Sequence, residues 1–370
     1  MASGDLWAGA EVQVATLLRA LAEREDLALS AILLNEGRLA EELRSAGIPV
    51  TVFPESQMSF LAILRHAGEQ LRRCPVRVLH SHRYKENLLA VLLAWRCGVP
   101  VLVRSQHGLP ELFSGWTRLK QRFLQFTDRQ VARWATDSII GVSQDLVGKL
   151  SQLTGSRKVV LVRNGIAVDR VNSPLTVAQA KARLGLPAEA LVVGNAGRLE
   201  PIKRLDLFLE AAHSISAQLP EARFLLAGEG RERIRVFDLA RKLGLAERVL
   251  LTGHRDDVYD VLRAMDVFLL TSDHEGLPMA LLEAQCLGVP VVTRQVGGVA
   301  EVICQDSTGV LVDSAQPSQL AAACVRLLTN PGARGRLAAA GRKAVKQFDI
   351  QKSAAEVAQL YFSLCGIPQL

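Results

Sequence analysis

The 370-residue sequence lacks any long hydrophobic run. Its longest unbroken apolar segment is Leu88 to Trp95, far shorter than the roughly 20 residues that a transmembrane helix needs. Aromatic residues make up only 5% of the chain and no nucleic-acid motif is present, so the formal charge of +7 does not indicate nucleic acid. Phosphate-bearing ligands and an anionic membrane surface are the partners that this charge favours.

Metal-binding patterns are also lacking. The 6 cysteines form no Cys-x-x-Cys pair and the 7 histidines do not have zinc-site spacing, so reduced thiols in a cytoplasmic protein are the expected state. No Asp-x-Asp motif occurs. Asp256, Asp257 and Asp260 cluster where a helix should start, a position at which acids favour the helix dipole. We therefore expect no metal ion and no cofactor.

What the sequence does have is alternating strand and helix patterns, in two series. Strands that alternate with helices form parallel sheets covered on both faces, and the length suits two domains of average size. We expect an N-terminal domain over 1–172, a C-terminal domain over 173–347, and a closing helix within 348–370. The segment from Val171 to Ala178 holds Asn, Ser and Pro and is interpreted as a linker.

The N-terminal domain shows no obvious first strand. Gly4 and Gly9 lie in a loop that opens an amphipathic helix over Glu11 to Arg24, and only Met1-Ala2-Ser3 precede it. The first strand of a doubly wound sheet is central, and three residues are too few to form it. We expect either that the native chain begins upstream, with roughly ten more apolar and β-branched residues, or that the sheet lacks an inner strand.

The most specific pattern lies after the apolar strand Val267 to Leu270. Glu275 falls in the loop that follows this strand, and Glu283 falls on the next helix. Pro278 suits the first helical position, and the helix start offers free N–H groups to an anion. Helix from Pro278 to Glu283 rises by about 7.5 Å. Two carboxylates with an anion-binding helix start between them fit a molecule that has hydroxyls at both ends and phosphate between, such as a nucleotide sugar.

A second motif follows the strand that opens the C-terminal domain. The segment Gly197-Arg198-Leu199-Glu200-Pro201-Ile202-Lys203 has a glycine at which backbone can approach a ligand closely. Arg198 offers a fork of donors suited to phosphate, and Lys203 adds a point charge. The segment predicts a phosphate-binding turn, with a basic surface turn as the alternative. Gly228-Glu229-Gly230 is a weaker pattern, for which a plain turn is the simpler interpretation.

Histidines follow two strands of the N-terminal domain. His107 comes at the end of one strand, at the carboxyl edge where ligands bind in open α/β sheets. His80 and His82 flank Ser81 near another strand end. For this pair, contact with an acceptor and a purely local structural role both remain open.

Together these segments resemble the retaining glycosyltransferases of family 4, which have the GT-B fold. The Glu-x7-Glu pair and the Gly-Arg-Leu-x-Pro-x-Lys segment match the motifs of that family, and Gly297-Gly298 with Glu301 is similar to a further segment near the donor. Gly9-Ala10-Glu11 keeps part of a Gly-Gly-Ala-Glu-like pattern, with Ala8 where glycine is usual. The resemblance implies two doubly wound Rossmann-like domains facing across a cleft, with a C-terminal helix that crosses back to the first domain.

The resemblance also implies residue roles. Arg198 and Lys203 would hold and neutralise the donor diphosphate, Glu283 the ribose hydroxyls, and Glu275 the donor sugar. The residues implied in catalysis are His107, Arg198, Lys203 and Glu275. Those implied in donor binding are Gly9, Arg198, Lys203, Glu275, Gly276, Leu277 and Glu283.

The implied reaction is transfer of a hexose from a nucleotide-diphosphate sugar to a glycan or lipid-linked acceptor. It would retain the anomeric configuration, need no metal, and serve cell-surface polysaccharide or glycolipid biosynthesis. Two alternatives remain open. One is a non-hydrolysing sugar-nucleotide epimerase of the same fold, and the other is a non-catalytic member that binds a partner.

A basic aromatic stretch runs from Ser114 to Trp134. Its basic residues are Arg118, Lys120, Arg122, Arg129 and Arg133, interleaved with Trp116, Phe123, Phe126 and Trp134. A basic amphipathic helix with aromatic residues suits a membrane surface, which would place the protein peripherally on the inner membrane face. A packed helix with its basic face in water is the alternative.

Overall fold

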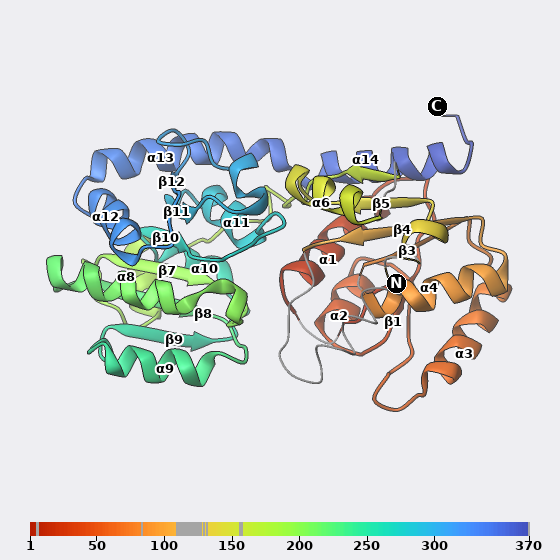
Figure 1. Cartoon of the computed structure of the whole chain (residues 1–370), viewed down its shortest axis with the longest axis horizontal. Coiled ribbons are helices and arrows are strands. Elements are labelled where there is room, and N and C mark those ends of the chain that lie inside the picture. The colour runs from red at the N-terminus through yellow and green to blue at the C-terminus, as the bar shows by residue number, and fades with distance from the viewer. Residues whose placement is uncertain are drawn as a thin grey trace. The chain divides into compact units, whose positions relative to one another are not determined.

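The computed structural model describes residues 1–4, 7–82, 84–108, 128, 130, 132–154 and 158–368 (Figure 1). Most of the basic aromatic stretch lies outside the described residues. The chain divides into two compact units. Unit 1 comprises Met1–Gly165 with Ile350–Leu370, and unit 2 comprises Ile166–Asp349.

Along the chain, unit 1 first ends at Gly165, seven residues before the domain boundary expected after residue 172, because the chain joins unit 2 at Ile166. The backbone N–H of Ile166 donates to the carbonyl of Phe348, and the Cys286 thiol lies 3.7 Å from the carbonyl oxygen of Val168. The expected linker over Val171 to Ala178 is therefore partly wrong. Helix α7 (Val177–Arg183) begins inside it, where Thr176 and Gln179 form a capping box.

Unit 2 is built on a parallel sheet in the order β12-β11-β10-β7-β8-β9. Its strands are β7 (Val192–Ala196), β8 (Arg223–Ala227), β9 (Val249–Gly253), β10 (Val267–Leu270), β11 (Val291–Arg294) and β12 (Val310–Val312). The other helices are α8 (Leu205–Gln218), α9 (Arg233–Lys242), α10 (Val258–Arg263), α11 (Met279–Cys286), α12 (Pro317–Leu328) and α13 (Pro331–Ala344), with 3-10 turns η1 (Pro201–Lys203), η2 (Gly297–Glu301) and η3 (Val345–Phe348). The strand order reverses between β7 and β10, so the loops after these two strands flank the topological switch point, where open α/β sheets bind ligands.

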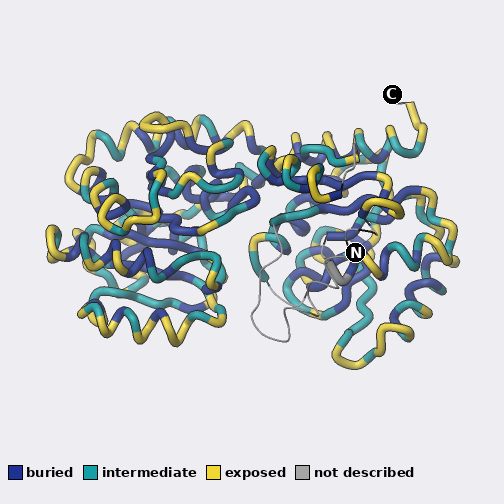
Figure 2. Tube along the Cα trace, viewed as in Figure 1, coloured by how far each residue is buried: buried dark blue, intermediate teal, exposed yellow. Residues whose placement is uncertain are grey.

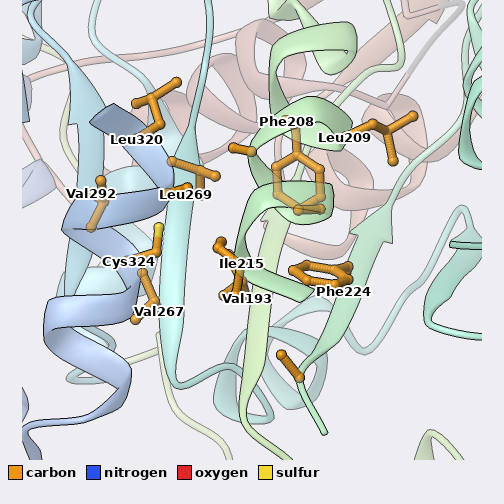
Figure 3. Packing of buried hydrophobic residues seen from close by; sticks show 14 of the residues in the cluster. Val193, Phe208, Leu209, Ile215, Phe224, Val267, Leu269, Val292, Leu320 and Cys324 are labelled. Carbon is orange, nitrogen blue, oxygen red and sulfur yellow. The ribbon is translucent and has the colours of Figure 1, made fainter. Parts of the chain in front are cut away.

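The core of unit 2 follows from strands that are apolar on both faces. Phe208 of α8 and Phe224 of β8 are fully buried and lie close together in Figure 3. Cys324 of α12 is also buried in this cluster, and burial raises the pKa of its thiol. It is an unreactive core side chain, in line with the expectation of reduced thiols.

Unit 1 holds two parallel sheets, β1-β2 and β3-β4-β5-β6. Its strands are β1 (Ala31–Leu33), β2 (Val50–Val52), β3 (Val78–Ser81), β4 (Val101–Gln106), β5 (Ser138–Gly141) and β6 (Val159–Leu161). Its described helices are α1 (Gly9–Ala22), α2 (Arg38–Ser45), α3 (Phe60–Arg73), α4 (Tyr84–Cys97), α6 (Gln144–Thr154) and α14 (Ile350–Leu364). The C-terminal helix α14 packs against α1 and therefore belongs with the N-terminal part of the chain.

The three residues Met1-Ala2-Ser3 lie between β1 and β3 but form no strand, and the sheet is divided in two at this place, as expected for a segment too short to form the inner strand. Ala2 pairs in parallel with Leu33 of β1. On the other side, the backbone N–H of His82 donates to the carbonyl of Met1 at 3.2 Å. This segment needs little length of its own, because the neighbouring strands on both sides supply its hydrogen-bond partners.

Burial follows the layers. The strands are mostly buried and the outer helix faces are exposed (Figure 2). Within the described ranges, no helix is long and apolar enough to cross a membrane.

Candidate active site

Two loops meet at the switch point of unit 2. One follows β7 and carries Gly197 and Arg198 into η1, and the other follows β10 and carries Glu275 into α11. The Thr271 hydroxyl donates to the Lys203 carbonyl at 2.8 Å, and the Asp273 N–H donates to the Ile202 carbonyl at 2.9 Å. These bonds join the two predicted motifs, which are 72 residues apart at Lys203 and Glu275, into one site.

Lys203 and Glu275 form an ion pair in this site. The Lys203 ammonium lies 2.7 Å from Glu275 Oε1, and the Ser272 hydroxyl donates to the same oxygen at 2.6 Å. The two charged side chains are only 19% and 11% exposed, so each loses most of its water and depends on the other. The sequence predicted both residues for the site, but not their contact.

Two arginines that the sequence analysis missed fix the loop after β10. Arg294 donates to Asp273 and to the carbonyl of Ser272 at 3.1 Å, and Arg204 donates to Asp273 at 3.2 Å. Arg294 stands at the carboxyl end of β11, directly beside β10, and that strand-end position was the available signal. Nothing in the sequence pattern marked the role of Arg204.

Glycines bring the loops close together. Gly297 has φ +50°, and a Cβ there would lie 1.9 Å from the Glu275 carbonyl oxygen. The Gly298 N–H donates to that same oxygen at 3.2 Å. Only glycine allows the η2 turn to approach the Glu275 backbone so closely.

Helix α11 begins one residue later than the sequence suggested. Pro278 is extended, with φ −73° and ψ 117°, and is the N-cap rather than the first helical residue. The N–H groups of the first helical turn have no acceptor within the helix and carry the positive end of the helix dipole. Gly276 and Leu277, both buried, lead directly into this turn. The start of α11 can therefore hold an anion.

Glu283 lies one helical turn further along α11 and is 7% exposed. Within the described part of the chain, its carboxylate receives no hydrogen bond, and burial raises its pKa to about 7. A largely buried carboxylate to which no protein group donates is costly unless water or a ligand supplies the donors. The arrangement is explained if a ligand supplies the donors.

Unit 1 contains two of the predicted site residues, Gly9 and His107. Gly9 is the exposed first residue of α1, and His107 follows β4 with its Nε2 3.4 Å from His82 Nδ1. His80 bonds Tyr361 Oη at 2.5 Å and Ser105 Oγ at 2.8 Å. Burial lowers the pKa of His80 and of His82 well below 6.5, so both rings are neutral. These two bonds support a structural role for His80, and contact with an acceptor stays a prediction for this pair.

The structure as described shows no metal centre. Among the residues that the structure describes, no three His, Cys, Asp or Glu side chains are grouped to hold a metal ion. Asp257 pairs instead with Arg255, whose hydrogen bond lowers the Asp257 pKa, and Asp260 accepts from Ser173 at 2.7 Å.

Two Rossmann-like α/β units, one of which has a helix start at its switch point that can hold an anion, are typical of nucleotide-binding proteins. Comparison with known proteins specifies the class further. Residues 7–170 match the family described as Glycosyltransferase Family 4, and residues 177–344 match the family described as Glycosyl transferases group 1.

Curated relatives agree. The chain is 30% identical to a D-inositol 3-phosphate glycosyltransferase of Thermobispora bispora, over 77% of this chain and 70% of that one. It is 26% identical to the Escherichia coli UDP-Gal:alpha-D-GlcNAc-diphosphoundecaprenol alpha-1,3-galactosyltransferase, over 88% and 85%. The chain belongs to the family 4 glycosyltransferases and is an enzyme of that type.

Solved structures share the fold. HepE of Anabaena, crystallised with UDP-glucose, has a TM-score of 0.85 at 21% identity, with 98% of each chain covered. WaaG, a glycosyltransferase involved in lipopolysaccharide biosynthesis, has a TM-score of 0.77 at 17% identity, with 98% of each chain covered. The fold is therefore GT-B, as the sequence predicted.

Proposed function

We propose that this glycosyltransferase takes a hexose from a nucleotide-diphosphate sugar and transfers it with retention of configuration, without a metal ion. The observation that supports this most is Glu283, one turn along α11, a carboxylate only 7% exposed to which no group in the described ranges donates a hydrogen bond. A ribose supplies two adjacent hydroxyl donors, and a diphosphate suits the helix start. The structure of HepE contains UDP-glucose, so UDP-hexoses are the first donors to test.

The remaining residues take roles around this donor. Arg198 and Lys203 would neutralise the diphosphate as it leaves with growing negative charge. Glu275, which now accepts from Lys203 and Ser272, would accept from the sugar hydroxyls. The backbone N–H groups of Gly276 and Leu277 would donate to phosphate oxygens. His107 and Gly9 would act on the acceptor side or at the donor sugar.

Retention without a protein nucleophile requires attack on the face that the leaving group occupies. In this proposal the acceptor hydroxyl oxygen bonds to the anomeric carbon while the carbon–phosphate oxygen bond breaks. The departing diphosphate takes the hydroxyl proton, so charge and protons balance. A fixed pair of cations beside the diphosphate would lower the barrier to this step.

The acceptor is proposed to be an anionic, glycan or lipid-linked molecule in cell-surface biosynthesis. The named relatives use D-inositol 3-phosphate and a diphosphoundecaprenol-linked sugar, both of which carry phosphate. A peripheral position on the inner membrane would suit a lipid-linked acceptor. Trp134, at the end of the basic aromatic stretch, is 74% exposed with the Arg133 guanidinium 5.2 Å from its ring, which supports membrane contact.

A thermal-shift screen of nucleotide sugars, followed by product analysis with candidate acceptors, tests the function. A true donor should raise the melting temperature, because it binds only the folded protein. Glu283→Gln should lose this shift, whereas Glu210→Gln, a change at an exposed position on α8, should keep it. Interconversion of the donor without acceptor would favour the epimerase alternative. Binding with neither transfer nor hydrolysis would favour a non-catalytic member.

A further inference from the structure

A pocket of about 400 Å³ lies in unit 2 at the C-terminal end of α11, whereas the anion-binding position is at the N-terminal end of this helix. Its lining includes Cys286 and Leu287 where α11 ends, and Arg263 at the end of α10. From Met279 to Leu287 the chain rises by about 12 Å, so the pocket lies at the opposite end of α11 from the anion-binding helix start and about one turn beyond Glu283. Its volume is within the range of small-molecule sites.

Two guanidiniums are held side by side in this pocket. Arg263 Nη1 and Arg342 Nη2 both donate to the Leu287 carbonyl oxygen, at 3.1 and 2.6 Å. A second bond from Arg263 to the Leu175 carbonyl, at 3.4 Å, fixes its orientation. Each guanidinium has five N–H donors, so both keep donors for another partner.

The pocket has an excess of positive charge. Lys346 is the third cation in the lining, and Asp169 is the carboxylate there. Within the described part of the chain, none of Arg263, Arg342 and Lys346 forms an ion pair with a carboxylate. Burial and then the charge of Arg342 lower the pKa of Arg263, which reflects two like charges held together.

Capping of α11 does not account for this charge. A single cation near a helix C-terminus already satisfies the exposed carbonyls and the negative end of the dipole. Here two arginines bond one carbonyl and a lysine stands nearby. Arg342 moreover requires Gly288, since a Cβ there would lie 2.4 Å from Arg342 Nε.

We propose that this cationic pocket, defined by Arg263, Arg342 and Lys346, binds a phosphate group. Two guanidinium forks match the paired oxygens of phosphate, and the ammonium adds charge without demanding a fixed geometry. The phosphate belongs to a soluble phosphomonoester or to a phospholipid headgroup. Binding here would act on the end of the same helix whose other end and Glu283 face the donor.

The half-buried thiol of Cys286 lies in the lining, and burial raises its pKa, so it can report on the pocket by slow alkylation at alkaline pH. Its alkylation by iodoacetamide is followed by mass spectrometry in inorganic phosphate and in sodium chloride of equal ionic strength. Phosphate at ten times its Kd should slow alkylation by roughly tenfold. Cys74, which is exposed and distant in sequence, should react equally in both salts.

Substitutions separate this pocket from the donor site. Lys346→Gln and Arg342→Gln should each weaken the phosphate protection of Cys286 by roughly tenfold or more. Lys343→Gln, also exposed on α13 but absent from the lining, is the matched control. Arg198→Gln removes a phosphate ligand from the donor site and should leave the protection intact. Lys346 forms no capping bond, so its variant tests the charge even if Arg342→Gln disturbs α11.

Two further arms identify the source of the phosphate. Protection by glycerol phosphate, without binding to phosphatidylglycerol vesicles, assigns a soluble ligand. Sedimentation with those vesicles that Lys346→Gln reduces and Lys343→Gln does not assigns a lipid headgroup. Equal alkylation of Cys286 in phosphate and chloride, or protection that survives both pocket substitutions, would overturn the proposal.

Discussion

Replacement of Glu283 by glutamine should have opposite effects on stability and on ligand affinity. Burial raises the pKa of Glu283 from 4.5 to about 7, so the folded protein binds its proton more tightly than the unfolded chain does. The stability linked to this proton is fully present below pH 4.5 and is lost as the pH rises to about 7. At about 1.4 kcal/mol per pH unit, the loss amounts to about 3 kcal/mol.

Glutamine carries no titrating charge, so Glu283→Gln should escape this loss. The free energy of unfolding, measured by urea denaturation at pH 5 and at pH 8, should fall by about 2.5 kcal/mol more in the wild type than in the variant, because part of the loss has already occurred at pH 5. Glu210→Gln controls for the general loss of a carboxylate. Parallel pH dependence in wild type and variant would refute the argument that Glu283 is a buried, unpartnered acid.

Affinity should change in the other direction. The ribose hydroxyls need the ionised carboxylate as acceptor, and a hydrogen bond to a charged group contributes roughly 1.5–3 kcal/mol. UDP should therefore bind roughly tenfold to hundredfold more weakly to Glu283→Gln above pH 7, and the difference from wild type should shrink below pH 7. Calorimetric titration at several pH values measures this. Equal UDP affinity at pH 8 would remove Glu283 from the ribose site.

Three further predictions concern catalysis, loop geometry and the membrane. Arg198→Ala should lower kcat by roughly 10²–10³, while EDTA should leave the wild-type rate unchanged; loss in EDTA that magnesium restores would contradict a metal-free reaction. Gly297→Ala should abolish most activity, because its Cβ would overlap the Glu275 carbonyl, whereas Gly335→Ala, in open space on α13, should be harmless in the same rate assay. Trp134→Ala should reduce sedimentation with anionic vesicles at low salt; a wild type that stays in the supernatant would exclude membrane docking.

Local patterns were sufficient to predict much of the fold. The two series of alternating strand and helix patterns appear as the parallel sheets and covering helices of the two units. Helix α7 was missed because Ser173 and its neighbours have linker composition, although the Thr176–Gln179 capping box was visible in the sequence. The place of Met1-Ala2-Ser3 could not be predicted, since it depends on partner strands that lie far along the chain.

Part of the candidate site was also visible in the sequence. The motifs placed Lys203 and Glu275 after strands at the switch point, where strand order brings them together. The contact of Arg294 with Asp273 joins residues 21 apart through tertiary packing, which no local pattern encodes. That Glu283 would be buried could be read from its apolar helix. The sequence could not predict that no described group donates a hydrogen bond to Glu283, because the placement of such partners depends on the whole fold.

The Lys203–Glu275 pair has a consequence for turnover under the proposed function. Before the donor arrives, each charge is compensated by the other, so the empty site is not penalised for holding them. An intact donor would give phosphate to Lys203 and hydroxyls to Glu275 at once. The spent nucleotide would still engage the lysine but leave the carboxylate with only Ser272 as a donor. The enzyme would then bind the uncleaved donor more tightly than the nucleotide product. Product inhibition would be weaker as a result, without any conformational change of the protein.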